Sequence, residues 1–161
     1  MATGQNEHQM KLIERSLQAQ EISNEFWTWG VRSPSTIGID VGELQGLDGE
    51  NLYLFRCDLD NANLSGAVLD GADLRLVSMQ NAICRGAQMN GIRIGGSDLR
   101  GSVLAGANLT ASFMHLVKLD NADLSGANLA GCRLGGASLK NANLASANLA
   151  GCDFNLGTDV E

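Results

Sequence analysis

The stretch that decides the fold is residues 61–75, which reads NANLSGAVLDGADLR. A large apolar residue stands at every fifth position, and an alanine stands two places before each of them. The five-residue spacing continues without a gap over the clean register, residues 52–154. The large residues in this register are Leu54, Leu59, Leu64, Leu69, Leu74, Met79, Cys84, Met89, Ile94, Leu99, Leu104, Leu109, Met114, Leu119, Leu124, Leu129, Leu134, Leu139, Leu144, Leu149 and Phe154.

A period of five fits neither the helix repeat of 3.6 residues nor the strand repeat of 2. The chain must therefore bend inside each unit. In a unit such as Ala62-Asn63-Leu64, strand-like alternation turns Ala62 and Leu64 inward and Asn63 outward. Glycine or asparagine usually occupies the second of the two remaining positions, and both residues tolerate the backbone angles of a corner. Each unit buries two side chains, so stability has to come from stacking unit on unit, as in a solenoid.

Runs such as Asn61-Ala62-Asn63-Leu64-Ser65 and Asn121-Ala122-Asp123-Leu124-Ser125 resemble the A-(D/N)-L-x-x signature of the pentapeptide-repeat proteins. The match covers about two thirds of the chain. The resemblance implies an all-β solenoid, a right-handed quadrilateral β-helix with four units per coil. It also implies a bacterial protein, similar to the small stand-alone members of cyanobacteria.

The domain organisation predicted from the sequence is a cap followed by a rod. Residues 1–36 are expected to form an N-terminal helix and an aromatic capping segment, residues 37–157 the β-helix, and residues 158–161 a tail. The cap is needed because the end of a β-helix has unpaired strand edges and an open apolar bore. The cap residues are predicted to be Met10, Ile13, Leu17, Trp27 and Trp29. At the other end, Phe154 either closes the bore or leaves an open face for end-to-end homodimerisation.

Charge and composition exclude several classes of function. Residues 1–51 hold eight acidic and three basic residues (8 − 3, net −5), whereas residues 52–161 hold ten and eight (10 − 8, net −2). The nearly neutral rod argues against direct nucleic-acid binding, which needs clustered Lys and Arg. No apolar run approaches the length of a membrane span, and the first residues do not resemble a signal peptide, so we expect a cytoplasmic protein that does not bind membranes.

The four cysteines, Cys57, Cys84, Cys132 and Cys152, all occupy inward positions. Small, buried, reduced side chains are the favoured interpretation. Cys132 and Cys152 lie twenty residues apart and would stack directly, at a separation compatible with a disulfide. No metal site is expected, because no histidine shares these positions and no CxxC pair is present.

Nothing in the sequence predicts an enzyme or a cofactor. His8 and His115 have no recognisable acid or nucleophile partner. The glycine-rich run Gly91–Gly96 lacks the Lys-Ser/Thr of a phosphate-binding loop, and its glycines fall at repeat corners.

One side of the rod departs most from the repeat consensus, counting twenty residues per coil as the resemblance implies. Arginines, aromatic residues and apolar neighbours gather there, a composition typical of protein-binding surfaces. The alternative is drift in a tolerant repeat, since single exposed apolar residues are ordinary. We call this surface the Arg/aromatic side; its predicted residues are Phe55, Arg75, Leu76, Arg93, Phe113, His115, Leu116 and Arg133.

Three functions remain open from the sequence. The first is a non-catalytic module that presents this side to a protein partner. The second, implied by another branch of the resembling family, is a DNA mimic that binds and protects DNA gyrase or a related topoisomerase. Members of that branch are acidic dimers with a C-terminal helix, and we expect no such helix in the seven residues after Phe154. The third is a purely structural or assembly role.

Overall fold

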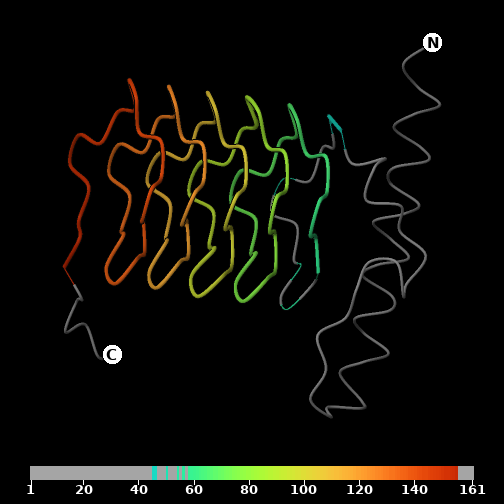
Figure 1. The fold of residues 1–161 in the computed structure, drawn as a ribbon, viewed down its shortest axis with the longest axis horizontal. Coiled ribbons are helices and arrows are strands. Elements are labelled where there is room, and N and C mark those ends of the chain that lie inside the picture. The colour runs from blue at the N-terminus through green and yellow to red at the C-terminus, as the bar shows by residue number, and fades with distance from the viewer. Residues whose placement is uncertain (1–44, 47–49, 51–53, 55, 57, 156–161) are drawn as a thin grey trace.

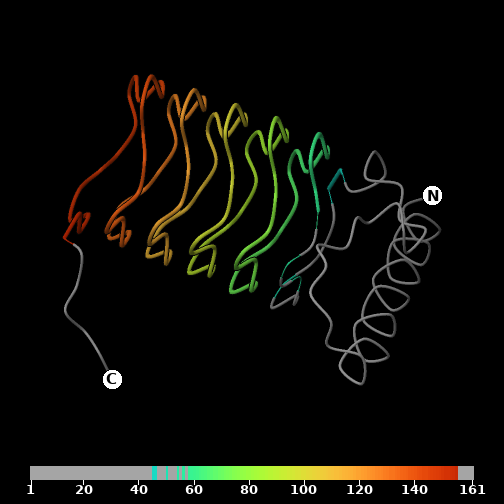
Figure 2. The same ribbon diagram turned by 60° about the horizontal axis from the view of Figure 1, so that its bottom comes forward.

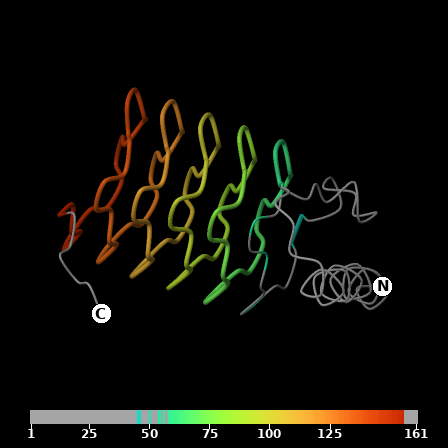
Figure 3. The same cartoon turned by 90° about the horizontal axis from the view of Figure 1, so that it is seen from below.

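The chain winds into stacked coils of twenty residues (Figure 1). The computed structural model describes residues 45–46, 50, 54, 56 and 58–155. Figures 2 and 3 show the same coils from two further directions, as evenly spaced turns that follow one another along a single axis. The expected right-handed quadrilateral β-helix is confirmed.

Parallel β-bridges hold neighbouring coils in register. Every fifth residue from Asp58 to Arg133 is bridged to the residue twenty positions later, from Asp58 with Ser78 to Arg133 with Asp153. Four five-residue units therefore complete one coil, and each side of the rod is paired at a single residue per coil. Extended strands are absent from the part of the chain that the structure describes, because a corner follows every three residues.

Backbone hydrogen bonds use four of the five N–H groups in a typical unit. In the unit Ala62–Gly66, Ala62 N–H donates to the carbonyl of Leu59 across the preceding corner. Leu64 and Gly66 donate to Ile83 and Arg85 of the next coil. The bridge residue of that next coil, Ile83, donates back to Ala62. The N–H of the residue after the central leucine is left over, and a buried donor without a partner is costly.

Asparagine or aspartate at the bridge position usually satisfies this fifth donor. The side-chain Oδ1 of Asn63 accepts from Ser65 N–H at 3.1 Å, and that of Asp123 accepts from Ser125 N–H, also at 3.1 Å. This local Asx hydrogen bond gives a physical reason for the D/N of the A-(D/N)-L pattern. Where the bridge residue lacks such an oxygen, an aspartate one coil earlier can substitute: Asp60 accepts from Gln80 N–H at 2.7 Å and Asp70 from Asn90 N–H at 2.7 Å.

The second corner residue of each described unit has a positive φ, between 56° and 70°. Glycine takes this conformation at no steric cost and asparagine at little, which explains why they dominate the position. Leucine, alanine, serine or arginine occupies a few corners despite the cost, and the exceptions are Arg56, Leu76, Ala111, Leu116 and Ser146.

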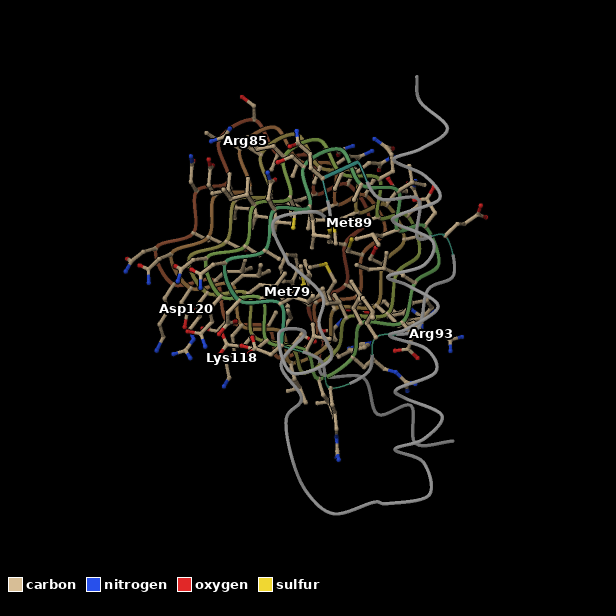
Figure 4. All side chains as sticks on the ribbon, turned by 90° about the vertical axis from the view of Figure 1, so that its right-hand side faces the viewer. Met79, Arg85, Met89, Arg93, Lys118 and Asp120 are labelled. Atoms are coloured by element: carbon tan, nitrogen blue, oxygen red, sulfur yellow. The ribbon has the colours of Figure 1, made fainter. Side chains whose placement is uncertain are left out.

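The core fills the inside of the coils. The central residues from Leu59 to Leu134 are at most 3% exposed, and most residues two places before them are buried as well. Figure 4 looks at the end of the rod: Met79 and Met89 point inward, whereas Arg85, Arg93, Lys118 and Asp120 point outward. The sequence predicted this inward column correctly.

Several predictions fall outside the described residues. The helix and aromatic cap, with Met10, Ile13, Leu17, Trp27 and Trp29, belong to this group, and so does Phe55. Phe154 is described, and it is 53% exposed, so it does not close the bore. In the last coil Ala137, Leu139, Ala142, Leu144, Ala147, Leu149 and Cys152 are only partly buried against the core. Over the ranges that the structure covers, no helix is sufficiently long and apolar to cross a membrane.

Candidate functional site

The Arg/aromatic side consists of three parallel columns of residues, each running along the rod. The bridge column points outward from the middle of the side. A second column, here called the shoulder column, follows each central residue, and the corner column comes next. The bridge column contains Asp73, Arg93, Phe113, Arg133 and Asp153; the shoulder column Arg75, Gly95, His115, Gly135 and Asn155; and the corner column Leu76, Gly96, Leu116 and Gly136.

In three successive coils the bridge column cannot form the local Asx hydrogen bond. Asp73 and Asp153, at its ends, still accept from Arg75 N–H and Asn155 N–H. The three residues between these two ends have no side-chain oxygen that could accept this hydrogen bond: Arg93, Phe113 and Arg133. On the other sides of the described coils, at most two successive bridge residues are neither Asp nor Asn, as at Ile83 and Val103. This side therefore departs furthest from the pattern that satisfies the backbone.

Charges and an aromatic ring lie close together on this surface. The Arg75 guanidinium forms an ion pair with Asp73 at 2.6 Å, and the Arg133 guanidinium carbon lies 5.0 Å from the centre of the Phe113 ring, a cation–π contact. Partial burial would raise the pKa of Asp73, but hydrogen bonds and charge from Arg75 outweigh it, and the pKa of that carboxyl lies below its ordinary value. Asp73 therefore stays ionised at neutral pH.

The corner column exposes two leucines. Leu76 is 46% exposed and Leu116 61% exposed, and both have φ of 58°. A left-handed backbone costs an L-residue roughly 1–2 kcal/mol relative to glycine. Solvent exposure does not repay that cost, and strained non-glycine residues cluster at functional sites. The leucines are thus neither favoured by the backbone nor used by the core.

The Ser97 hydroxyl braces the corner that carries Arg75 and Leu76. Its Oγ donates to the carbonyl of Leu74 at 2.8 Å and accepts from Val77 N–H at 3.1 Å. From its place in the next coil, Ser97 thus links the two residues on either side of this corner, Leu74 and Val77. This brace was not predicted from the sequence; its signal there is a serine at an inward position that is most often alanine.

The remaining sides are occupied mainly by polar ladders. Asn148 Nδ2 donates to Asn128 Oδ1 at 3.0 Å, and Asn143 Nδ2 donates to Asp123 Oδ1 at 3.0 Å, so these side chains link neighbouring coils. Arg100 pairs with Asp98 at 2.6 Å on a neighbouring side. Ile83, 39% exposed, is bridged to Val103, and the two form a smaller apolar strip on another side.

Apart from Phe55, the residues predicted for the Arg/aromatic side do lie on one side of the rod. Arg93, Phe113 and Arg133 are bridged to one another in sequence, and Leu76 and Leu116 mark the adjoining corner. His115 is half-buried in the shoulder column between Gly95 and Gly135. From the sequence, glycines were expected only at corners, whereas Gly95 and Gly135 come directly before a corner residue of positive φ. A Cβ at Gly135 would clash with the carbonyl oxygen of Asn155 and would lie 3.0 Å from His115 Nδ1.

Cys132 and Cys152 are free thiols, so the considered disulfide is not formed. Each instead donates to a backbone carbonyl: Cys132 to Leu109 at 2.9 Å and Cys152 to Leu129 at 3.0 Å. Burial raises the pKa of Cys84 to about 12 and that of Cys132 to about 11, which keeps both thiols protonated and unreactive. Among the described residues, no cluster of His, Cys, Asp and Glu could hold a metal ion.

The chain is similar to several solved structures. A trypsin-treated form of QnrB1, a plasmid-mediated fluoroquinolone resistance protein, superimposes with a TM-score of 0.54 at 23% identity, over 71% of this chain and 68% of that one. Rfr23 from the cyanobacterium Cyanothece 51142 gives a TM-score of 0.41 at 28% identity, covering 66% of each chain. HetL from the cyanobacterium Nostoc sp. strain PCC 7120, involved in heterocyst differentiation regulation, gives 0.40 at 25%, covering 66% and 65%. The likeness to QnrB1 shows the fold alone.

No curated protein matches the sequence. The family model described as pentapeptide repeats (8 copies) matches residues 57–96, 91–126 and 122–156, which is more than half of the chain. These matches span the coils whose bridges, corners and core are described above. The chain belongs to the pentapeptide-repeat family.

Proposed function

We propose that this protein is a non-catalytic protein-binding module and that the Arg/aromatic side is its binding surface. The observation that carries the proposal is the pair of leucines on this side, Leu76 and Leu116, which are exposed and adopt a backbone conformation unfavourable for leucine. Selection for stability alone favours glycine or asparagine at such corners. A surface that binds a partner gains from apolar anchors beside arginines.

Family membership supports the same class of function. Pentapeptide-repeat proteins are in general non-catalytic structural or protein-binding proteins. The filled interior supports it too, because a core of close-packed side chains offers no concave pocket for a substrate. What the rod can present is its outside and its ends.

The experiment compares binding of the wild type and of an Arg93→Ala, Phe113→Ala double variant. Both are immobilised and exposed to lysate of the source organism, and each captured protein is then purified and titrated calorimetrically against both forms. We expect binding to the double variant at least about tenfold weaker. The matched control is Ile83→Ala, Arg85→Ala, which removes one apolar residue and one arginine from a different side. Equal affinity for wild type and Arg93→Ala, Phe113→Ala would refute the binding surface.

The DNA-mimic function is the second candidate. The fold shared with QnrB1 is compatible with it, but acidic and basic residues nearly balance over residues 52–161, whereas a mimic of DNA needs a dominant negative charge. A gyrase supercoiling assay with a fluoroquinolone distinguishes the two: protection of gyrase by this protein would favour the mimic, and its absence the protein-binding module. A purely structural role predicts no captured protein that binds directly.

A further inference from the structure

Large and small residues alternate from coil to coil in two columns of the Arg/aromatic side. The shoulder column reads Arg75, Gly95, His115, Gly135. The corner column reads Leu76, Gly96, Leu116, Gly136. Every second coil therefore projects bulky side chains from these two columns, and the coil after it has glycine at both positions.

This alternation becomes complementary to itself when its direction is reversed. Consider a second copy placed face to face and antiparallel, related by a two-fold axis midway between the coil of Arg93 and that of Phe113. Each column then faces the same column of the other copy in opposite order, as an isologous interface requires. Leu116 of each copy falls opposite Gly96 of the other, and Leu76 opposite Gly136. In the shoulder column, His115 falls opposite Gly95 and Arg75 opposite Gly135.

The exposed leucines would then form one continuous row. At coil spacings of about 4.8 Å, the sequence along the seam is Leu76, the second copy's Leu116, Leu116 and the second copy's Leu76. In the single rod Leu76 extends over Gly96 of the next coil, since a Cβ on Gly96 would come within 2.7 Å of Leu76 Cδ2. The end of this flexible side chain has to turn aside when the second copy's Leu116 packs against Gly96. The row buries four leucine side chains that a single rod leaves about half exposed, 46% at Leu76 and 61% at Leu116.

The bridge column is complementary under the same two-fold axis. Asp73, whose carboxylate also pairs with Arg75 of its own chain at 2.6 Å, faces Arg133 of the second copy. Arg93 faces Phe113 of the second copy. The first pairing is between opposite charges and the second is between a guanidinium and an aromatic ring, the type of contact that Arg133 already makes with Phe113 inside one rod.

Other registers fit less well. An axis through Phe113 would place Arg93 against Arg133 and Leu116 against Leu116, which opposes like charges and bulky residues. An axis one coil further on, between Phe113 and Arg133, pairs Arg93 with Asp153 but leaves Leu76 without a counterpart. The axis between Arg93 and Phe113 is the one that covers both leucines of each copy.

We propose that the Arg/aromatic side binds a second copy of this chain, forming an antiparallel two-fold dimer with the leucine row at its seam. This inference rests on the proposed function, because it names the partner of the same binding surface. Four coils extend on the order of 20 Å along the rod, so the interface belongs to the small, weak class. Dimerisation is therefore concentration-dependent and reversible.

The test is a charge exchange between Asp73 and Arg133, followed by sedimentation equilibrium of the full chain from about 10 µM to about 1 mM. The wild type dimerises in this range. Asp73→Arg alone creates two Arg–Arg contacts in a homodimer, and Arg133→Asp alone creates two Asp–Asp contacts. Each single variant dimerises at least about tenfold more weakly than the wild type. An equimolar mixture of the two variants restores two opposite-charge contacts and dimerises at wild-type strength.

The matched control is Asp98→Arg. Asp98 pairs with Arg100 at 2.6 Å, with the same two-residue spacing as Asp73 and Arg75, but on a neighbouring side. This variant dimerises as the wild type does. Recovery in the mixture also shows that both single variants are folded, because unfolded chains could not restore the pairing.

Four results would overturn the inference. The first is a wild type that stays monomeric up to 1 mM, and the second is a mixture that does not recover. The third is recovery by mixing Arg93→Asp with Asp153→Arg, which would identify the other register. The fourth is a dimer that Asp73→Arg leaves intact and Leu144→Asp disrupts, which would place the contact at the coil end. A monomeric wild type whose captured partner still requires Arg93 and Phe113 leaves the proposed function standing while the dimer fails.

Discussion

Ser97 and Ser102 show how much a single inward hydroxyl depends on its surroundings. Both are fully buried in the same inward position of their units. The Ser97 hydroxyl bonds Leu74 and Val77, whereas the Ser102 hydroxyl is a buried side-chain polar atom without a hydrogen-bond partner among the described residues. Buried polar atoms stabilise only when they are satisfied.

We predict opposite effects of alanine at these two positions. Ser97→Ala leaves the Leu74 carbonyl and Val77 N–H without their partner and should lower the free energy of unfolding by about 1–3 kcal/mol. Ser102→Ala removes an unsatisfied hydroxyl and should be neutral or stabilising. Urea denaturation at pH 7 measures both. Equal losses for the two variants would contradict the role assigned to the Ser97 brace.

Leu116 carries the strain of the corner column most clearly, since it is 61% exposed with φ of 58°. Leu116→Asn should raise the free energy of unfolding by about 1 kcal/mol, because asparagine tolerates the left-handed region. The same variant should weaken binding through the Arg/aromatic side. Asn121, already an asparagine at the next corner, provides the reference: Asn121→Leu should destabilise by a similar amount. Thermal and urea denaturation of the two variants test the pair.

At the scale of the element, each side of a coil is stabilised by what its bridge residue does for the backbone. The Asn128 Oδ1 accepts from Ala130 N–H at 3.2 Å and from Asn148 Nδ2 at 3.0 Å. One asparagine therefore completes the hydrogen bonding of its own unit and links it to the next coil.

We predict that Asn128→Ala lowers the free energy of unfolding by about 1–2 kcal/mol, through the loss of these two hydrogen bonds. Asn128→Asp keeps the accepting oxygen and should retain most of that stability. The urea concentrations at the midpoints of unfolding of the two variants, compared with that of the wild type, test this prediction. If alanine and aspartate were equally destabilising, the Asx hydrogen bond would not explain the D/N of the repeat.

Aspartates on the sides of the coils make the stability of the protein depend on pH in the acid range. Hydrogen bonds from Arg100 hold the pKa of Asp98 below its ordinary value, and hydrogen bonds from Ser138 and Ser125 do the same for Asp120 and Asp123. A carboxyl whose pKa is lower in the folded state stabilises fully above its unfolded pKa, about 3.9. That contribution is lost as the pH falls through the folded pKa values.

We therefore expect the urea concentration at the midpoint of unfolding to decrease as the pH is lowered below about 4. In an Asp98→Asn, Asp123→Asn variant this decrease should be less steep. The same variant is less stable than the wild type at pH 7, since it loses the ion pair with Arg100. A pH dependence unchanged by the two substitutions would show that other groups control acid unfolding.

For the whole molecule, stability is the sum of contacts between neighbouring coils. Leu104 lies inside the stack and is fully buried, whereas Leu144 in the last described coil is only partly buried. Leu104→Ala should cost about 2–5 kcal/mol, the range for a cavity in a close-packed core. Leu144→Ala should cost clearly less, because its site already has contacts on one side only. A larger loss for Leu144→Ala in urea denaturation would contradict this picture of the stack.

The inside and the outside of the rod could be predicted from the sequence because they depend on a one-dimensional period. The recurrence of Leu64, Leu69 and Leu74 fixes which residues turn inward, whatever lies in the neighbouring coil. Glycine and asparagine at the corners follow from the φ that a corner needs. The number of four units per coil was inferred from the family resemblance. The β-bridges between residues twenty positions apart confirm it.

Only the tertiary structure decided which residues meet across coils. The hydrogen bond of Ser97 with Leu74 depends on distances between stacked coils, and so does the exposure of Phe154. The same is true of the free thiols of Cys132 and Cys152. The same holds for the exposed fractions of Leu76 and Leu116. A repeat specifies the direction of each side chain, but hydrogen bonds and solvent exposure depend on three-dimensional neighbours that the period leaves open.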